Sequence, residues 1–347
     1  MRLCIDARMI RSSGIGTTLQ HLIPLLAQTS HEIILLGEKQ GELPMSSRFT
    51  SPIYSLSEQI QFPWKIPSCD VFWSPHYNAP LLPIRAKKRI VTIHDVCHLT
   101  YPLSRFKRLV SHFLLQKACQ TSDQIVTVSA FSKSEILAHL NVLQEKIHVI
   151  YPGVDRQQFS SQKKEQTPPF FLFVGNIKTH KNLSVLLKAF ELLQPTNLHL
   201  IIVGKKEGLL SSDQTLDEHL RQSPLKNQIK LLGEISSSEL QTLYASASAL
   251  IFPSLYEGFG LPPLEAMASG CPVIASNAAS IPEVCQDAAL YFSPRSPQEL
   301  AEQMRRILSE ASLRQQLIQK GLALSAFFSW EKTAKKYCAL FFDSDPN

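Results

Sequence analysis

Two carboxylates flank a short glycine-rich loop in the second half of the chain, in the segment SLYEGFGLPPLEAMASGCPVIAS. Glu257 heads the loop, and Glu265 follows after seven intervening residues, on the first turn of a helix expected to begin near Pro262. A strand, a glycine loop and a helix start leave backbone N–H groups that suit a phosphate. Carboxylates there would accept hydrogen bonds from sugar hydroxyls. On spacing alone, a solvated Glu257 and a helix-capping Glu265 explain the segment equally well.

Two lysines follow an apolar run earlier in the chain, in FFLFVGNIKTHKNLSVLLKAF. We expect a buried strand, a turn at Gly175 and Asn176, and a helix capped near Asn182, with Lys178 and Lys181 between turn and helix. Lysines at the carboxyl end of a strand can neutralise a diphosphate as point charges. A merely solvated Lys178 is the alternative.

Two further candidate sites lie in the first half. Gly14 and Gly16 follow the first strand in DARMIRSSGIGTTLQHLIPLL, where they suit either a phosphate or a tight turn needed for packing. His94 ends a strand in VTIHDVCHLTYP, where a buried core histidine is the alternative. His94, Cys97 and His98 have metal-ligand spacing only if this stretch is helical, and no distant fourth ligand is evident, so we expect no metal site.

The sequence alternates between short β-branched runs and amphipathic stretches. This pattern predicts α/β units around parallel sheets, and these units must position the candidate residues. Expected strands span residues 2–7, 32–36, 71–74, 89–94, 124–129 and 146–150, then 170–174, 199–203, 229–231, 249–252, 273–275 and 289–292. Expected helices span residues 17–28, 104–119, 132–140, 183–193, 237–245 and 262–268, and run from 297 to the end, with a capping box at Ser236 and Glu239. The proline-rich pieces FPWKIP and NAPLLPIR are expected to be loops.

The fold class predicted is therefore α/β, with two Rossmann-like domains facing each other across a cleft. We expect a first domain at residues 1–155, a polar linker at 156–169 and a second domain at 170–329. The C-terminal helix, about 330–347, is expected to pack back on the first domain.

Composition narrows the function classes. The formal charge of +6, from 35 Lys and Arg against 29 Asp and Glu, is too small for a nucleic-acid binder but suits an anionic ligand or membrane. Seven scattered cysteines form no disulfide pattern, and no run of 18 apolar residues occurs. The prediction is a cytoplasmic protein, either free or peripheral on the inner face of the membrane.

The segment PLSRFKRLVSHFLLQKAC bears on that membrane contact. It predicts a helix with one broad apolar stripe and several basic residues elsewhere. Such a helix either packs into its own domain or touches anionic lipid, where a lipid-linked acceptor would sit. The stripe comprises Leu103, Phe106, Leu109, Val110, Phe113 and Leu114.

The carboxylate segment resembles the signature of glycosyltransferase family 4, retaining enzymes of GT-B architecture. The resemblance implies that Glu257 contacts the transferred sugar and that Glu265 accepts hydrogen bonds from the ribose of the nucleotide. It also implies that the backbone of the loop meets the sugar and the pyrophosphate. The loop residues concerned are Gly258, Phe259, Gly260 and Leu261.

The same resemblance assigns roles elsewhere. Lys181 would stabilise the pyrophosphate, but the basic slot next to Gly175 holds Asn176, and Lys178 would have to supply its charge. Gly14 and Gly16 would approach the donor phosphates. His94 would lie nearest the chemistry. No cofactor or metal is implied beyond the donor substrate itself.

The segments GNIKTHKN and HDVCHLTYP are similar to those of bacterial polysaccharide mannosyltransferases, which favours GDP-mannose over a UDP-hexose as donor and a glycan or lipid-linked glycan as acceptor. Three alternatives are left open. A GT-B sugar-nucleotide epimerase shares the architecture, and Asn176 is compatible with a catalytically silent sugar-nucleotide-binding subunit. A nicotinamide-dependent oxidoreductase would use Gly14, Gly16 and Glu38, but Leu19 stands where its third glycine belongs.

Overall fold

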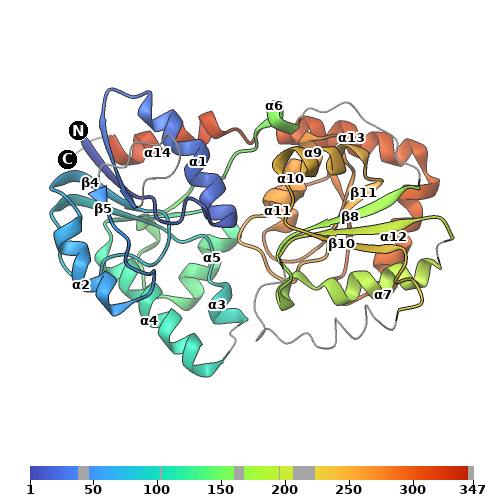
Figure 1. The fold of residues 1–347 in the computed structure, drawn as a ribbon, viewed down its shortest axis with the longest axis horizontal. Coiled ribbons are helices and arrows are strands. Elements are labelled where there is room, and N and C mark those ends of the chain that lie inside the picture. The colour runs from blue at the N-terminus through green and yellow to red at the C-terminus, as the bar shows by residue number, and fades with distance from the viewer. Residues whose placement is uncertain (38–46, 102–103, 160–167, 195, 206–222, 343–347) are drawn as a thin grey trace. The chain divides into compact units, whose positions relative to one another are not determined.

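The computed structural model describes residues 1–37, 47–101, 104–159, 168–194, 196–205 and 223–342. The chain forms two compact units. The first comprises Met1–Gly153 together with Trp330–Asn347, and the second comprises Val154–Ser329. The chain therefore returns to its first unit after completing the second (Figure 1).

The first unit is built on a seven-stranded parallel sheet of order β3-β2-β1-β4-β5-β6-β7. Its strands are β1 (Arg2–Asp6), β2 (Glu32–Gly37), β3 (Ser47–Arg48), β4 (Cys69–Ser74), β5 (Ala86–Thr92), β6 (Gln124–Thr127) and β7 (Ile147–Val149). Its described helices are α1 (Ser13–Ala27), α2 (Leu56–Lys65), α3 (Cys97–Thr100), α4 (Arg105–Thr121), α5 (Ala130–His139) and α14 (Trp330–Phe342), with a 3₁₀ turn at Gln144–Lys146.

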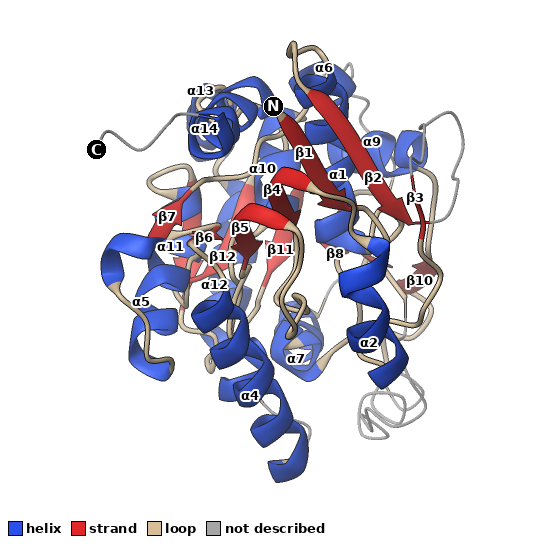
Figure 2. Cartoon of the chain, turned by 90° about the vertical axis from the view of Figure 1, so that its left-hand side faces the viewer, coloured by secondary structure: helices blue, strands red, loops and turns tan. Residues whose placement is uncertain are grey.

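Alternating side chains on these strands bury two different helical layers. On one face, Leu3, Ile5 and Trp73 pack with residues of α1 and α14. On the other face, Phe72 packs with residues of α2, and Val91 packs with residues of α4 and α5. Helices α2, α4 and α5 therefore share one layer, and α1 and α14 share the opposite one (Figure 2).

The second unit is built on a six-stranded parallel sheet of order β10-β9-β8-β11-β12-β13. The strands are β8 (Phe170–Val174), β9 (His199–Val203), β10 (Ile229–Gly233), β11 (Ala249–Phe252), β12 (Val273–Ser276) and β13 (Ala289–Phe292). The described helices are α6 (Arg156–Phe159), α7 (Leu183–Leu193), α9 (Ser237–Ser246), α10 (Leu261–Ala268), α11 (Ile281–Cys285), α12 (Pro297–Ser309) and α13 (Ala311–Ser325), with a 3₁₀ turn at Thr179–Lys181.

The predicted fold class of two Rossmann-like parallel-sheet domains is confirmed. The capping box is also confirmed: Ser236 accepts from the backbone of Glu239, and Glu239 accepts from the backbone of Ser236. The helical stretch expected from residue 297 to the end is three separate helices, α12, α13 and α14. In the segment expected as a linker, Arg156–Phe159 is helical, and residues 160–167 lie outside the described residues.

Two local predictions were wrong. FPWKIP is not a loop through its length, because α2 continues to Lys65 with Pro63 inside it. Asn182 precedes α7 but makes no side-chain cap. It adopts a left-handed backbone conformation, φ 56°, and its amide donates instead to the carbonyls of Pro253 (3.0 Å) and Pro294 (2.7 Å), tying the start of α7 to the ends of β11 and β13.

Candidate functional site

Strand order reverses between β8 and β11 in the second sheet, since β9 and β10 lie on one side of β8 and β11 to β13 on the other. Ligands of open parallel sheets bind at such a switch point, outside the carboxyl ends of the strands. Lys181 lies in the connection that leaves β8, and Glu257 lies in the one that leaves β11. The topology thus brings together two candidates that are 76 residues apart in sequence.

Lys181 and Glu257 form an ion pair. The ammonium Nζ donates to Oε1 of Glu257 at 2.6 Å, and the two side chains are 17% and 12% exposed. The same ammonium lies 5.7 Å from the ring centre of Phe252, the last residue of β11. Because the pair is largely shielded from water, its attraction is stronger than that of a surface pair, although both side chains remain within reach of a ligand.

Three hydrogen bonds and the conformation of one glycine fix the backbone of the loop between β11 and α10. The hydroxyl of Ser280 donates to the carbonyls of Glu257 (2.9 Å) and Phe259 (3.0 Å). The backbone N–H of Leu255 donates to the carbonyl of His180 at 2.7 Å, which links the two connections of the switch point. Gly260 has φ +110°, a conformation that other residues rarely adopt. The backbone of the loop is therefore fixed by its own domain.

Glu265 lies one turn further into α10 than predicted, in the second turn of a helix that begins at Leu261. It is partly buried, and its Oε2 accepts a hydrogen bond of 2.9 Å from the hydroxyl of Tyr244 on α9. Burial raises the pKa of Glu265 to about 6, although the hydrogen bond from Tyr244 opposes the rise. Its carboxylate is mostly ionised at neutral pH and is held in one orientation.

The turn after β8 is also fixed by glycine geometry. Gly175 donates its N–H to Val203, and a side chain at Gly204 would place its Cβ 2.0 Å from the carbonyl oxygen of Gly175. The ends of β8 and β9 therefore approach too closely for any other residue at Gly204. Beyond them, Asn176 is half-buried and Lys178 is exposed, three residues before Lys181.

The two glycines of the first unit have different surroundings. A Cβ at Gly16 would lie 2.5 Å from the carbonyl oxygen of Ile10, so Gly16 is required by packing between the loop and α1. A Cβ at Gly14 would meet nothing within 4 Å. Of the two interpretations of this loop, the packing one fits Gly16, and the space beside Gly14 suits the approach of a ligand.

His94 lies just beyond β5 and is partly buried. Its Nε2 is 2.9 Å from the carbonyl oxygen of Pro75, which can only accept, so Nε2 carries the proton and Nδ1 is the acceptor nitrogen. Burial lowers the pKa of His94, which opposes protonation, while Pro75 and Asp95 favour it. The imidazole is thus neutral at neutral pH and has an acceptor nitrogen available for a hydroxyl proton.

Two residues that the sequence did not single out gather near His94. His76 follows β4, and its ring lies within hydrogen-bonding distance of the hydroxyl of Tyr54 at 3.2 Å. Burial, with smaller contributions from His94 and His98, lowers the pKa of His76 to about 3. Tyr54 has a left-handed backbone with φ 68°, a strained conformation for an aromatic residue. His76, Tyr54 and His94 form a polar group at the carboxyl edge of the first sheet.

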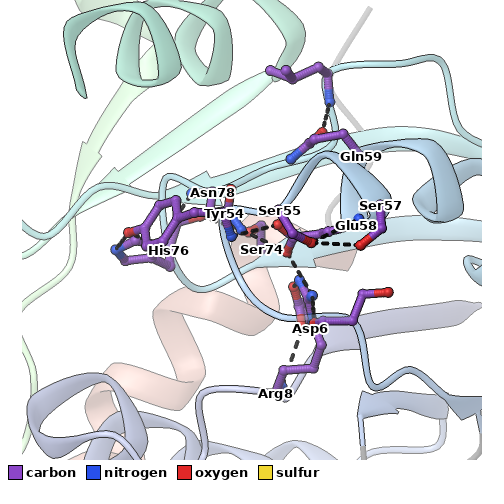
Figure 3. A network of polar contacts seen from close by, with 12 residues as sticks. Asp6, Arg8, Tyr54, Ser55, Ser57, Glu58, Gln59, Ser74, His76 and Asn78 are labelled. Atoms are coloured by element: carbon purple, nitrogen blue, oxygen red, sulfur yellow. Dashed lines mark hydrogen bonds and ion pairs between the residues drawn. The ribbon is translucent and has the colours of Figure 1, made fainter. Parts of the chain in front are cut away.

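A buried ionic network supports that edge (Figure 3). The guanidinium of Arg8 is 2.6 Å from Oδ2 of Asp6 and 2.6 Å from Oε1 of Glu58, and it stacks 4.3 Å from the ring centre of Phe49. Glu58 also accepts from the side chain of Asn78 at 2.7 Å. Because the carboxylates of Asp6 and Glu58 neutralise the guanidinium of Arg8, this side chain is not available to bind a phosphate, and we assign the network a structural role.

No group of three or more histidine, cysteine, aspartate or glutamate side chains in the described ranges is arranged to hold a metal ion. Cys97 and His98 lie in α3, whereas His94 precedes that helix. The functional candidates that sequence reasoning missed are Tyr244, Ser280, His76 and Tyr54. Only spatial proximity identifies them, because no local motif contains them.

Two parallel sheets with reversed strand order, each with a glycine-containing connection at its switch point, define a protein built from two Rossmann-like domains. Residues 12–158 match the family described as Glycosyltransferase Family 4, and residues 154–323 match the family described as Glycosyl transferases group 1. The chain belongs to glycosyltransferase family 4, as the sequence resemblance predicted.

Curated relatives agree with this membership. The O-antigen chain mannosyltransferase RfbU of Salmonella typhimurium is 35% identical over 63% of this chain and 59% of its own length. O-antigen chain mannosyltransferase B of Escherichia coli is 31% identical over 74% of this chain and 71% of its own. The match to RfbU thus spans less than two thirds of that relative.

Solved structures show the same fold. HepE from Anabaena, in complex with UDP-glucose, superposes with a TM-score of 0.80 at 16% identity, covering 98% of this chain and 99% of that one. The sucrose-phosphate synthase of Thermosynechococcus elongatus has a TM-score of 0.80 at 16% identity, covering 98% of each chain. Both likenesses confirm the GT-B class of fold.

Proposed function

We propose that the protein transfers a hexose, with mannose favoured, from a nucleotide-diphosphate sugar to a glycan or lipid-linked glycan in polysaccharide biosynthesis, with retention at the anomeric carbon. The observation that carries the proposal is the Lys181–Glu257 pair at the switch point of the second sheet, beside the fixed loop from Gly258 to Leu261. Family membership supports the activity, and the mannosyltransferase relatives favour mannose.

The donor binds to the second domain in this proposal. The loop residues Gly258, Phe259, Gly260 and Leu261 present backbone groups to the sugar and the diphosphate. Glu265, oriented by Tyr244, accepts from the ribose hydroxyls, and Glu257 accepts from the transferred sugar. GDP-mannose is the favoured donor and a UDP-hexose is the second candidate, since the similar HepE structure contains UDP-glucose.

Lys181 changes partner when the donor arrives. Without donor, its ammonium is neutralised by Glu257 at 2.6 Å. A diphosphate carries more charge than one carboxylate and attracts the ammonium more strongly, which frees Glu257 for the sugar. Lys178 adds a second positive charge in place of the arginine usual at Asn176, and the turn at Gly175 brings both lysines to the phosphates.

The reaction breaks the bond between the anomeric carbon and the diphosphate oxygen, which keeps the electron pair. The acceptor oxygen bonds to that carbon on the same face, and its proton passes to a donor phosphate oxygen. Lys181 stabilises the charge that grows on the leaving group. This assignment needs no protein nucleophile and no bound cofactor.

The first domain holds the acceptor in this proposal. His94, neutral with Nδ1 as its acceptor nitrogen, lies nearest the chemistry, and His76 and Tyr54 stand beside it to orient acceptor hydroxyls. Gly14 leaves room for a phosphate at the start of α1, whereas Gly16 keeps the loop in place.

The proposal also includes the cytoplasmic side of a membrane as the place of work, because a lipid-linked acceptor would be anchored there. No helix among the described residues is long and apolar enough to cross a bilayer. In this proposal the contact with the membrane is peripheral, and no nucleic acid takes part.

Incubation with a panel of radiolabelled nucleotide sugars tests the activity. We expect hydrolysis or transfer of GDP-mannose above every UDP-hexose, and its loss in Lys181→Ala. Folded protein that turns over none of the panel would argue against the proposal. Tight donor binding without turnover across many acceptors would instead indicate the silent subunit, and an altered sugar nucleotide recovered without acceptor would indicate the epimerase.

A further inference from the structure

Ser280 lies in the connection between β12 and α11 and is fully buried. Its hydroxyl donates to the carbonyl oxygens of Glu257 at 2.9 Å and of Phe259 at 3.0 Å, both in the connection between β11 and α10. A serine hydroxyl carries one proton, so the two carbonyls share it. One side chain of a neighbouring connection therefore holds two peptide groups of the loop at residues 257–261, which we call the donor loop.

The hydroxyl of Ser280 does not serve its own helix. Ser280 occupies the position before α11, where a serine side chain usually accepts a hydrogen bond from a backbone N–H of the first turn. Ser280 makes no such capping bond. The residue before it, Ala279, has a left-handed backbone with φ 55°, which is unfavourable for alanine. Backbone strain of this kind is typical of functional sites, and here it accompanies a serine that is directed to the donor loop.

The two carbonyls that Ser280 holds determine where two N–H groups point. A trans peptide group is planar, and its C=O and N–H bonds have opposite directions. The carbonyl of Glu257 shares its peptide group with the N–H of Gly258. The carbonyl of Phe259 likewise shares its peptide group with the N–H of Gly260. Because both carbonyls face Ser280, both glycine N–H groups face away from it, on one side of the donor loop.

The donor loop also lies close to the lysine that is assigned to the diphosphate. A Cβ at Gly260 would lie 3.4 Å from Cε1 of Phe252. The ammonium of Lys181 lies 5.7 Å from the centre of the same ring. Gly260 and Lys181 therefore approach one aromatic side chain at the switch point. Backbone N–H groups on one side of a loop, with an ammonium nearby, suit the oxygens of a diphosphate.

We propose that Ser280 is a positioning residue for the donor, whose hydroxyl keeps the N–H groups of Gly258 and Gly260 directed to the diphosphate and the transferred sugar. This role rests on the proposed function, which places the donor on this loop. Without the hydroxyl, two buried carbonyls lose their partner, and their peptide groups can rotate. The donor would then have to order the N–H groups as it binds, which lowers its affinity.

Two substitutions of nearly equal shape isolate the hydroxyl. Ser280→Thr keeps it, and Ser280→Val replaces it with a methyl group, so both add similar bulk to the buried position. Calorimetric titration measures the affinity of each variant for GDP, and competition with GDP measures the affinity for guanosine. We expect Ser280→Val to bind GDP about tenfold more weakly than Ser280→Thr. Guanosine, which has no phosphate, should bind equally to both.

Ser276→Ala is the matched control for Ser280→Ala, a pair that adds no bulk. The hydroxyl of Ser276 is also buried, and it donates to a carbonyl of the same connection, that of Ser254 at 2.5 Å. This carbonyl lies outside the donor loop. Thermal melts should show a loss of stability in both variants, because each leaves a buried carbonyl without its partner. Only Ser280→Ala should weaken the binding of GDP.

Three results would overturn the positioning role. Ser280→Thr and Ser280→Val could bind GDP equally well, which would show that the hydroxyl does not matter. Ser280→Val could lose affinity for guanosine as much as for GDP, or Ser276→Ala could weaken GDP binding as much as Ser280→Ala, and either would show a general effect on the fold. A folded wild type that binds neither GDP nor UDP would overturn the proposed function, and this inference with it.

Discussion

The ammonium of Lys181 and the carboxylate of Glu257, 2.6 Å apart, join the two connections that leave β8 and β11. In the absence of donor, the two charged groups pair with each other. In the proposed complex, Lys181 binds the diphosphate and Glu257 binds the transferred sugar. The pair therefore holds both side chains at the switch point, and a diphosphate that takes the place of Glu257 on Lys181 releases that carboxylate for the sugar.

Lys181→Ala should lower kcat on the order of 10²- to 10³-fold, because one preorganised charge on the leaving group is lost. The thermal midpoint should change little, since Glu257 is close enough to the surface to become hydrated. Steady-state kinetics and a thermal melt check both expectations. Lys188→Ala, at an exposed position on α7, is the matched control. Equal turnover of the two variants would remove Lys181 from the mechanism.

Lys178→Ala tests the substitution for the missing arginine. Because Lys178 is exposed, its charge is screened more than that of Lys181, and we expect a smaller loss of kcat. Asn176→Arg in the same background should restore part of the activity. If Lys178→Ala has wild-type kinetics at low salt, Lys178 is only solvated.

Glu265→Gln should raise the free energy of unfolding and weaken the binding of the donor. The raised pKa of Glu265, about 6 against an ordinary 4.5, means that the ionised form costs about 1 to 2 kcal/mol of folding free energy above pH 6. The neutral amide avoids this cost but accepts ribose hydroxyls less strongly. Urea melts at pH 8 and donor titrations measure the two effects. A variant with lower stability and undiminished affinity would contradict both.

The same residue predicts a pH dependence of donor binding. As pH falls through about 6, Glu265 becomes protonated and loses acceptor strength, so donor affinity should fall. In Glu265→Gln, donor affinity should no longer fall as the pH drops through about 6. A wild-type profile without a change between pH 5 and 7 would count against the ribose contact.

Gly14 and Gly16 should respond differently to alanine. Gly16→Ala forces a Cβ to 2.5 Å from the Ile10 carbonyl oxygen and should cost about 1 to 3 kcal/mol of stability. Gly14→Ala has space, and within a helix it should stabilise by roughly 0.5 to 1 kcal/mol. If donor or acceptor phosphates approach Gly14, this stable variant should still lose turnover. Chemical denaturation and kinetics on both variants separate the two roles.

The strands and the donor motifs could be predicted from the sequence because each is formed by a continuous run of residues. Phe170–Val174 is an unbroken apolar run, and the loop from Glu257 to Glu265 is one continuous segment. Helix α2 was missed for a physical reason: it buries Glu58 and exposes Leu56 and Trp64, so its periodicity contradicts the ordinary pattern, and Pro63 suggests a break.

Interacting residues that are far apart in the chain could not be predicted from the sequence. The Arg8–Glu58 pair spans 50 positions, and nothing near Glu58 marks it as the buried partner of an arginine. Tyr244 is recognised as the partner of Glu265 only once α9 and α10 are placed together. The close approach of Gly175 and Gly204 likewise depends on the parallel pairing of β8 and β9.

Calorimetric titration of GDP and UDP into wild type, Lys181→Ala, Glu265→Gln and Lys188→Ala tests the central claim most directly, since it measures donor-site binding without any acceptor. The account predicts tighter binding of GDP than of UDP to wild type. It predicts a loss of affinity of about tenfold or more in Lys181→Ala and Glu265→Gln, and no change in Lys188→Ala. Undiminished affinity in both site variants would show that the donor does not bind at the switch point between β8 and β11.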